Sequence, residues 1–412
     1  MDEPPAVEER AAKASDELQA VKEFLRAIQV AGALPATASK VPQFDILADV
    51  RTTLPTEAES EEARRLVLAH GWNATAYQIL NPGIDLWFPP DRSGVIGYVR
   101  YGATRVVAGA PVCELDKLDS IAARFLDESH QHGESVCYFG AGERLDAKYS
   151  AKPTWSRVLL GAQPSWNPKA WSAAVARRAS LRAQFNRARN KSVKVSEWPS
   201  AQAENHPALR RCLAEWLATR GLPPLHFLVE PETLSNLADR RVFVATCGTR
   251  DVVAFTVLSP VPARNGWLVE QIVRGRSAPN GTSELLLDSA VNAVAASGAQ
   301  YITLGLSPLS QRANADVGKQ PAWLRFTLRW LRLHGARFYN FRGLDAFKAK
   351  FNPEQWEPIY AISEGRTFPP RALYAIAGAF SGGNPLRLIA HALLRAVRDE
   401  ILRMWRRVRE SR

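Results

Sequence analysis

Residues 266–309 read GWLVEQIVRGRSAPNGTSELLLDSAVNAVAASGAQYITLGLSPL and show the pattern of a β-α-β unit. An apolar strand is followed by a turn rich in glycine, proline and asparagine, by a helix predicted over 282–296, and by a second apolar strand over 300–304. In such a unit the loop after the first strand places backbone N–H groups and the positive end of the helix at the carboxyl edge of the sheet. An anionic or carbonyl-bearing ligand is most easily held there. This loop also carries Arg274 and Arg276.

Three stretches share their pattern with a known family. They are VRGRSAPNGTSELLLDSAV (273–291), GAQYITLGLSPLS (298–310) and FRGLDAFKAKFNPEQWEPIYAI (341–362). Together they resemble the catalytic domain of lysyl- and alanyl-phosphatidylglycerol synthases, the multiple-peptide-resistance-factor family. The likeness covers roughly residues 64–362.

The resemblance implies an α/β (α+β) fold made of two tandem GNAT-like acyltransferase units joined by a basic helix. It also implies an aminoacyltransferase that moves an aminoacyl group from aminoacyl-tRNA to a membrane lipid such as phosphatidylglycerol. Aminoacyl-tRNA is then the donor substrate, and no cofactor is expected. The expected partners are aminoacyl-tRNA and an anionic phospholipid membrane surface.

An internal repeat favours two copies of one fold. In the first half a helix ends at Gly133 and an apolar strand ends at Gly140; in the second half the corresponding residues are Gly298 and Gly305. The offset is 165 residues in each case. The turn of the second copy carries the arginines, whereas that of the first reads CELDKLDS, so we expect the chemistry in the second copy.

The predicted organisation has five parts. They are an N-terminal helical extension and linker (1–56), the first GNAT-like unit (57–165), a basic connecting helix (166–200), the second, catalytic GNAT-like unit (201–368) and a basic amphipathic C-terminal helix (369–412). In the first unit, apolar runs predict a helix ending near His70, strands at 76–80, 86–88, 94–101 and 104–112, a helix over 118–132 and a strand over 136–139.

Composition limits the compartment and the partners. The 412 residues carry a formal net charge of +12, which favours a polyanionic partner such as nucleic acid or an anionic bilayer. The four cysteines are far apart in sequence and form no CxxC pair, which argues against a disulfide framework or a zinc site. The N-terminus opens acidic, and no long uncharged apolar stretch occurs. We therefore expect a cytoplasmic protein, peripheral on the inner face of the membrane.

Two basic segments stand out. Residues 166–196 contain eight basic residues and no acidic one, and on a helix they would form a positive stripe beside a buried side of Val175, Leu181 and Phe185. The residues expected to bind tRNA or lipid phosphates are Arg178, Arg182, Arg187, Arg189 and Lys191. The helix over 385–412 has apolar residues at i, i+3 and i+4 among eight arginines, as in helices that lie in a bilayer interface; docking on the protein or on a partner is the alternative.

Glu284 is the candidate general base or anchor for the substrate ammonium group. It lies in the first turn after APNG, where the family has an acidic residue. A purely structural role, complementing the helix dipole with Gly281 as N-cap, is the alternative.

The other candidates surround this position in the sequence. Arg274 and Ser307 are assigned to catalysis, with Ser307 as the oxyanion donor; a role only in the turn before Pro308 is the alternative for Ser307. The residues assigned to substrate binding are Arg276, Asn280, Gly281, Arg342, Lys348 and Lys350. Solvated charges and core aromatics are the alternative for these segments. No histidine has a recognisable catalytic context, and no spacing suggests a metal.

Two other functions stay open. An acyl-CoA-dependent transferase acting on a small amine or lipid normally has a compact pyrophosphate turn, and here the turn reads RGRSAPNGT. A lipid- or nucleic-acid-binding relative without catalysis is the third hypothesis.

Overall fold

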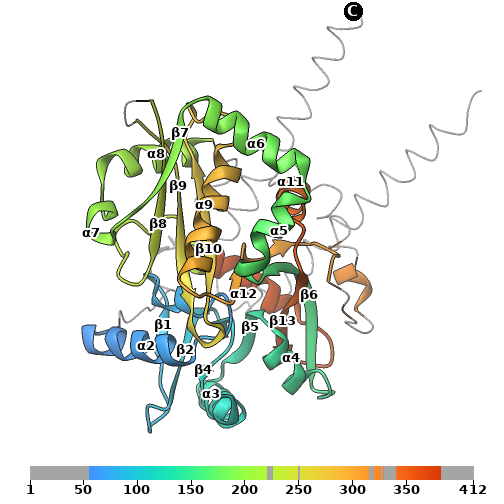
Figure 1. The fold of residues 1–412 in the computed structure, drawn as a ribbon. Helices are drawn as coiled ribbons and strands as arrows, with labels where there is room; N and C mark the ends of the chain where they lie inside the picture. Colours follow the sequence, from blue (N-terminus) through green and yellow to red (C-terminus); the bar gives the residue numbers. More distant parts are fainter. Residues whose placement is uncertain are drawn as a thin grey trace, which may run out of the picture.

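The computed structural model describes residues 55–219, 226–248, 251–313, 315, 320–325, 328 and 340–381. These residues form one mixed sheet of thirteen strands with helices on both faces (Figure 1). The strand order is β1-β2-β3-β5-β13-β6-β11-β10-β9-β8-β7, with β4 beside β2 and β12 beside β6. The predicted α/β class is confirmed in the form of this single large sheet.

Each half of the sheet repeats one topology. The first half contains β1 (Asp85–Trp87), β2 (Gly94–Tyr101), β3 (Thr104–Ala108), β4 (Val112–Cys113) and β5 (Ser135–Ala141). Strands β1, β2 and β3 pair antiparallel in sequence order, α3 (Leu118–Gln131) crosses over, and β5 then pairs parallel to β3.

The second half contains β7 (Val193–Trp198), β8 (Arg241–Cys247), β9 (Asp251–Val261), β10 (Gly266–Arg274) and β11 (Tyr301–Thr303). Strands β8, β9 and β10 pair antiparallel, α9 (Thr282–Ala296) crosses over, and β11 pairs parallel to β10.

The repeated glycines end corresponding elements in the same conformation. After the crossover helices, Gly133 and Gly298 have φ of 70° and 86°. At the ends of the following strands, Gly140 and Gly305 have φ of 83° and 68°. Side chains are disfavoured at such angles, which explains why glycine recurs at both places. Topology and backbone angles thus both support the repeat predicted from the sequence.

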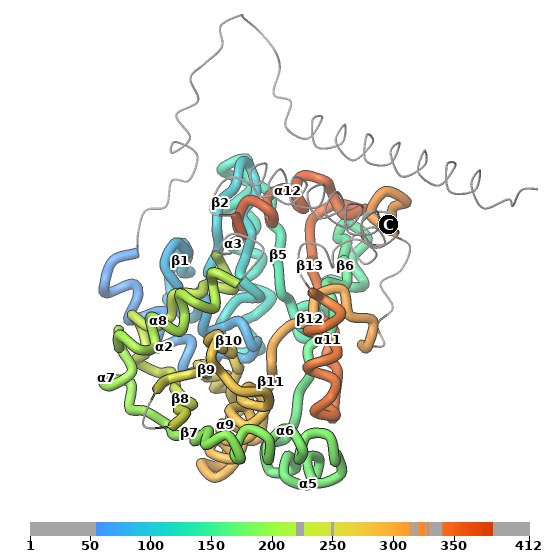
Figure 2. The backbone as a smooth tube through the Cα atoms, turned by 90° about the horizontal axis from the view of Figure 1, so that it is seen from above, coloured from blue at the N-terminus to red at the C-terminus, as the bar shows by residue number. Residues whose placement is uncertain are grey.

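The two halves exchange their last strands. Strand β6 (Trp155–Trp166) follows the first half in sequence but pairs with β11 of the second, and β13 (Gln355–Glu364) follows the second half but pairs with β5 of the first. The two exchanged strands pair with each other at the centre of the sheet (Figure 2). No single cut in the chain separates the two halves, and the predicted domain bounds stay a prediction.

A polar cluster ties this junction together. Glu357 of β13 accepts two hydrogen bonds from the guanidinium of Arg264, at 2.9 and 2.7 Å. It also accepts one each from the Gln163 amide of β6 and the Tyr301 hydroxyl of β11, both at 3.2 Å. Groups from both halves therefore converge on one carboxylate.

The described helices cover the sheet in four groups. In the first half, α2 (Glu57–His70) and α12 (Pro370–Phe380) share a core on one face, and α3 and α4 (Glu143–Tyr149) pack on the other. In the second half, α5 (Trp171–Ala176), α6 (Ala179–Asn190) and α9 pack on one face, and α7 (Ser200–Ala203) and α8 (Pro207–Ala218) on the other. Helix α11 (Phe341–Ala349) lies beside β12 (Ser307–Pro308). Short 3-10 helices are η1 (Tyr77–Leu80), η2 (Leu115–Lys117), η3 (Pro168–Ala170), η4 (Phe227–Val229) and η5 (Pro262–Arg264).

Three predicted elements differ from the structure. The strand predicted at 76–80 is the 3-10 helix η1, in which the consecutive residues Tyr77, Gln78 and Ile79 are all buried and Ile79 packs where Gly97 leaves room. The strand predicted at 104–112 is interrupted by Gly109, whose φ is 78°. The single connecting helix is two helices, α5 and α6, followed by strand β7.

Both predicted terminal helices, in 1–56 and at 385–412, lie outside the described residues. None of the helices in the described ranges combines the length and the apolar character needed to cross a bilayer.

Candidate functional site

Glu284 lies in the first turn of α9 and is paired with a lysine. Gly281 is the N-cap of this helix, as the structural alternative for this position has it, with φ of 92°. The Glu284 carboxylate accepts a hydrogen bond from the Lys350 ammonium at 2.5 Å. The side chains are 14% and 31% exposed, so the pair is largely shielded but still reached by water. Residues 66 positions apart in sequence are thereby brought together.

Aromatic rings form the floor under this pair. Lys350 lies 4.0 Å from the ring centroid of Phe347 and 5.3 Å from that of Phe351. The Phe351 ring in turn stacks on Trp171 of α5, with centroids 5.4 Å apart. An apolar floor lowers the local dielectric and strengthens the attraction between the two charges.

The first half carries a matching but exposed pair. Asp119, 165 residues before Glu284, lies in the first turn of α3 and accepts a hydrogen bond from Lys148 of α4 at 2.9 Å. The Asp119 side chain is 62% exposed. The same acid–lysine pair therefore occurs in both halves, and only the pair in the second half is largely shielded from water.

Helices α5 and α6 border the Glu284–Lys350 pair. A Cβ on Gly281 would lie 2.1 Å from the Gln184 carbonyl oxygen, so the backbone of α6 touches the start of α9. Trp171 donates a hydrogen bond to the buried Asp288 carboxylate of α9 at 3.0 Å. Arg178 donates one to Asn352, just after α11, at 2.8 Å. The basic segment is thus fixed against both elements that carry the pair.

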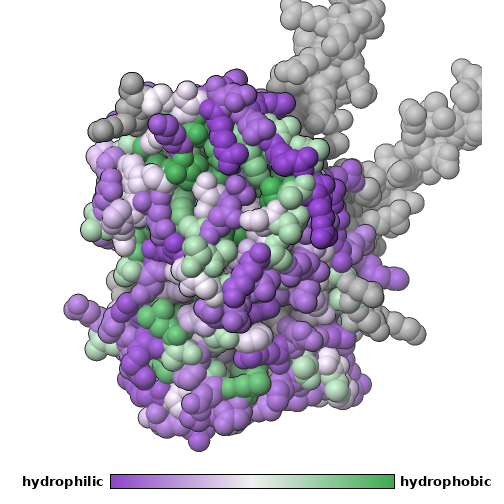
Figure 3. All heavy atoms as spheres, viewed as in Figure 1, coloured by the Kyte–Doolittle hydropathy of each residue, from purple (hydrophilic) through white to green (hydrophobic). Residues whose placement is uncertain are grey.

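The predicted basic stripe is exposed. Arg178, Arg182, Arg187, Arg189 and Lys191 all lie on the surface, while Val175, Leu181 and Phe185 are buried beneath them, as predicted. Hydrophilic residues follow α6 in Figure 3. Three of the cations make contacts within the protein: besides Arg178, Arg182 donates to the Ala176 carbonyl, and Arg189 lies 3.9 Å from Asp288.

The loop after β10 holds its own arginine. Arg274 donates hydrogen bonds to the Ala278 carbonyl at 2.7 Å and to Asn280 at 3.3 Å, so these contacts staple the turn. Arg276 has an exposed side chain, and its backbone N–H donates to Glu215 at 3.2 Å. Gly281 has no side chain and so lets the backbone of α6 pack closely against the start of α9. The predicted substrate roles of these residues stay predictions.

Ser307 and Lys348 are enclosed, and Arg342 is not. Ser307 is fully buried in β12, and its hydroxyl has no hydrogen-bond partner among the described residues. Lys348 is 5% exposed and donates hydrogen bonds to the carbonyls of Gly305 and Leu306, at 2.9 and 2.8 Å. It therefore holds the segment between β11 and β12. Arg342 is exposed on α11.

Burial lowers the pKa of Lys348 to about 7, against the opposing pull of Asp345. Its pKa in the unfolded chain is about 10.4. Between about pH 7 and about pH 10.4 the unfolded chain therefore binds more protons at this lysine than the folded protein does. The free energy of unfolding is highest above the unfolded pKa and falls as the pH is lowered towards 7.

We predict that the free energy of unfolding of the wild type, relative to that of Lys348→Met, rises by about 2–4 kcal/mol from pH 7 to pH 10. Each pKa unit of difference between the folded and unfolded states corresponds to about 1.36 kcal/mol. Urea unfolding of both proteins at several pH values measures this. A difference that does not change with pH would contradict it.

The pairing of Glu284 with Lys350 was not predicted, although each residue was singled out separately. Sequence offered only one signal for it, the recurrence of an acid at a fixed offset in both halves. The Trp171–Asp288 hydrogen bond was also missed, because nothing in the sequence around a tryptophan indicates which residue its indole N–H will bind. Within the described ranges, no three histidine, cysteine or acidic side chains converge to hold a metal ion.

Comparison with known proteins identifies relatives of this arrangement. The profile of the family described as "Phosphatidylglycerol lysyltransferase, C-terminal" matches residues 64–363. An uncharacterised protein of Corynebacterium glutamicum is 22% identical over 345 residues, covering 80% of this chain and 42% of that protein. The phosphatidylglycerol lysyltransferase of Bacillus subtilis is 23% identical over 308 residues, covering 74% of this chain and 35% of that enzyme.

A solved structure shares the fold. The C-terminal domain of a provisionally named lysylphosphatidylglycerol synthetase from Agrobacterium fabrum superposes with a TM-score of 0.67 at 22% identity, covering 79% of this chain and 98% of that one. The chain spans between 32% and 42% of the length of the curated relatives it matches.

Proposed function

Because the chain belongs to the phosphatidylglycerol lysyltransferase C-terminal family, we propose that it transfers an aminoacyl group from aminoacyl-tRNA to a hydroxyl of a membrane lipid such as phosphatidylglycerol. The names of distant relatives support this substrate class. The observation that carries the proposal is the shielded Glu284–Lys350 pair with a cationic surface directly beside it.

The reaction needs little beyond positioning and proton transfer. The lipid hydroxyl oxygen attacks the carbonyl carbon of the aminoacyl ester, and a new carbon–oxygen bond forms. The bond from that carbon to the ribose oxygen of the tRNA breaks, and the proton of the lipid hydroxyl ends on the ribose oxygen. Holding both reactants in line supplies much of the rate.

Glu284 and Lys350 would divide these tasks. The Glu284 carboxylate, held at 2.5 Å by the Lys350 ammonium, would orient the substrate amino group and the attacking hydroxyl. The Lys350 ammonium can stabilise negative charge that develops on the carbonyl oxygen. Arg274 and Arg276 at the adjacent turn, with Arg342, would contact phosphate groups.

Incubation with charged tRNA and phosphatidylglycerol vesicles, followed by mass spectrometry of the lipid, tests the proposal. An aminoacylated lipid is the expected product. Absence of a product with all twenty charged tRNAs would refute it, and product formed from acyl-CoA alone would favour the CoA-dependent alternative.

We predict that the double variant Arg187→Gln, Lys191→Gln binds tRNA more weakly and with less dependence on salt. Neither side chain has a hydrogen-bond or ion-pair partner within the part of the chain that the structure describes, so the fold should be unaffected. Each lost phosphate contact reduces the slope of log K against log salt by about 0.7–0.9, so the double variant should lose about 1.5.

Filter binding at several salt concentrations measures this slope. The control removes two exposed arginines elsewhere, Arg65→Gln and Arg92→Gln. Equal losses in both double variants would mean that only total charge matters and would contradict a tRNA track on α6.

A further inference from the structure

A small recess lies in the first half, where β3 and β5 end. Its walls include Trp72, Asn73, Ala110, Pro111 and Arg144, and it is called the Trp72 recess below. The cavity volume is about 30 Å³, which is the space that one water molecule occupies in the liquid. Only a species of about that size fits inside.

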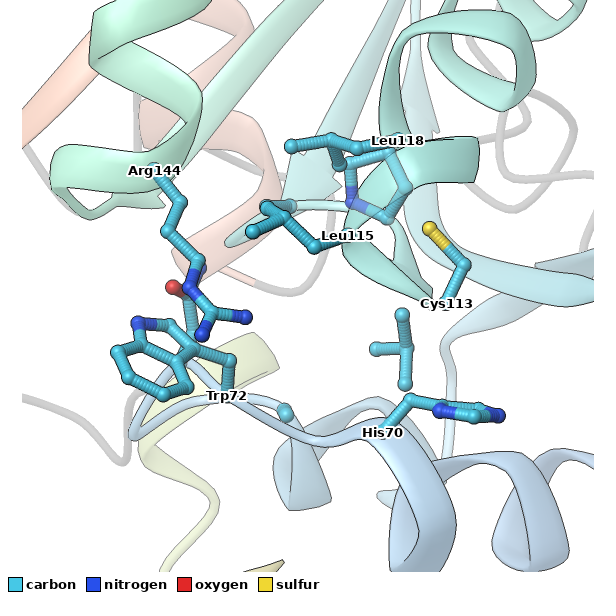
Figure 4. Close-up of a pocket in the computed structure, with 11 residues that line it drawn as sticks. His70, Trp72, Cys113, Leu115, Leu118 and Arg144 are labelled. Atoms are coloured by element: carbon cyan, nitrogen blue, oxygen red, sulfur yellow. The ribbon is translucent and has the colours of Figure 1, made fainter. Parts of the chain in front are cut away.

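Arg144 gives the recess a positive charge that no carboxylate neutralises. Its guanidinium lies against the Trp72 indole, 3.1 Å from the ring centroid (Figure 4). Arg264 lies 5.0 Å from the same centroid, but it is neutralised by Glu357 through two hydrogen bonds. Among the described residues no acidic side chain forms an ion pair with Arg144. Burial, and then the charge of Arg264, lower the pKa of Arg144, yet arginine keeps its proton in proteins, so the charge remains.

Two further hydrogen-bonding groups beside the recess lack partners. The Asn73 side-chain nitrogen and the Thr75 hydroxyl oxygen are both buried, and neither forms a hydrogen bond among the described residues. They lie close together, because a Cβ on Gly109 would be 3.1 Å from the nitrogen and 2.7 Å from the hydroxyl oxygen. A buried donor without an acceptor destabilises the fold, and a bound acceptor removes that cost.

The chemistry of these groups favours an anion over a water molecule. A water molecule carries two protons that need acceptors, whereas the nitrogens of Arg144 and Asn73 can only donate. A monovalent anion such as chloride is close to water in size, accepts hydrogen bonds without donating any, and neutralises the guanidinium. Phosphate, sulfate and carboxylate groups are too large for a cavity of this volume.

We propose that the Trp72 recess binds one monovalent anion of the size of chloride, held by the Arg144 guanidinium and the Asn73 amide N–H. Asn73 lies in the loop that follows α2 and Arg144 lies in α4, so the anion joins two segments that are distant in the sequence. Its effect is to stabilise the fold of the first half.

The site is separate from the chemistry proposed at Glu284. Strand β10 runs antiparallel to β3, as the pairings through β5, β13, β6 and β11 require. The loop after β10, which leads to Glu284, and the loop after β3, which borders the recess, therefore lie at opposite edges of the sheet.

Urea unfolding of the full chain at constant ionic strength tests the proposal, with sodium chloride replaced stepwise by sodium gluconate. Gluconate is too large for the recess. Chloride at ten times its dissociation constant should raise the folding equilibrium constant about tenfold over the value in gluconate, because it binds only the folded state. Sodium bromide should act as chloride does. Equal stability in chloride and gluconate would overturn the proposal.

Three variants assign the effect to the recess. Arg144→Gln removes the charge and Asn73→Leu removes the donor at similar volume, so both should lose the dependence on chloride. Arg92→Gln is the matched control and should keep it, because Arg92 also lies over an aromatic ring, that of Phe88, at 4.5 Å. A chloride effect of unchanged size in Arg144→Gln would show a general salt effect and overturn the site. Glu284→Gln should keep the effect, so the test does not depend on the proposed transfer.

Crystals of the wild-type protein grown in bromide give a readout that needs no variant to fold. An anomalous peak in the Trp72 recess, within contact of Arg144 and Asn73, is the expected result. A water molecule at that place, with no anomalous signal, would overturn the proposal. A bromide peak without any chloride effect on unfolding would mean an adventitious ion only and would overturn it as well.

Discussion

Under the proposed transfer reaction, replacing Glu284 by glutamine will lower the rate by about 10²-fold or more, since misplacement of the reactants costs about that much. Glutamine keeps the size of the side chain and a hydrogen-bond acceptor for Lys350 but removes the negative charge. The shielded ion pair is then replaced by a lysine without a counter-ion on an aromatic floor. Protein stability should change far less than activity, because α9 keeps its N-cap and its buried face.

The control for this variant is Asp119→Asn in the first half. Asp119 also occupies the first turn of a crossover helix and binds a lysine, at 2.9 Å, but it is largely exposed. We expect full activity from it. Rates measured over a range of tRNA and lipid concentrations separate the effects: loss of an ammonium anchor raises the KM for aminoacyl-tRNA, whereas loss of proton transfer lowers kcat. Similar activity in Glu284→Gln and wild type would exclude Glu284 from the reaction.

Replacing Gly281 by alanine will cost about 3–5 kcal/mol of unfolding free energy, a loss typical of a strained site combined with a backbone clash. The residue has φ of 92°, and its Cβ would lie 2.1 Å from the Gln184 carbonyl oxygen. Relief of that clash requires α6 to move away from α9. The movement would separate the basic surface from the Glu284–Lys350 pair, so we also expect weaker transfer activity.

Gly298→Ala separates backbone strain from the clash. Gly298 has a similar φ of 86°, but nothing lies within 4 Å of the position of its Cβ. It should therefore lose only the cost of an alanine in the left-handed region, about 1–2 kcal/mol. Urea unfolding of both variants under the same conditions measures the difference. Equal losses would show that α6 does not press on the start of α9.

Local pattern was sufficient for much of the second half. The strand–turn–helix–strand pattern of 266–309 appears as β10, α9 and β11. Gly281 is the N-cap, which the structural alternative included, and the apolar side of α6 is buried as its spacing indicated. These features depend on neighbours in sequence, since capping and helical periodicity act within one or two turns.

Local sequence pattern did not predict the environment of residues that pack against segments far away in the sequence. The run at 76–80 has the composition of a strand, yet it packs on all sides as a 3-10 helix, since Gly97 opens space for Ile79. The sequence places Ser307 at a turn before Pro308, whereas the structure places it in β12, where the pairing with β6 buries it; its role as an oxyanion donor stays a prediction. In both cases a strand from elsewhere in the chain decides the environment.

The amino-acid sequence by itself determined the family, the repeat of two similar halves and the cationic character of the segment between them. Only the tertiary structure decided which residues meet: β6 and β13 exchange places and join the two halves in one sheet, and Lys350 contacts Glu284. The physical reason is the distance along the chain over which each interaction acts. Periodicity, caps and charge runs are short-range properties written along the chain, whereas ion pairing and burial depend on contacts between residues far apart, which only the folded chain brings together.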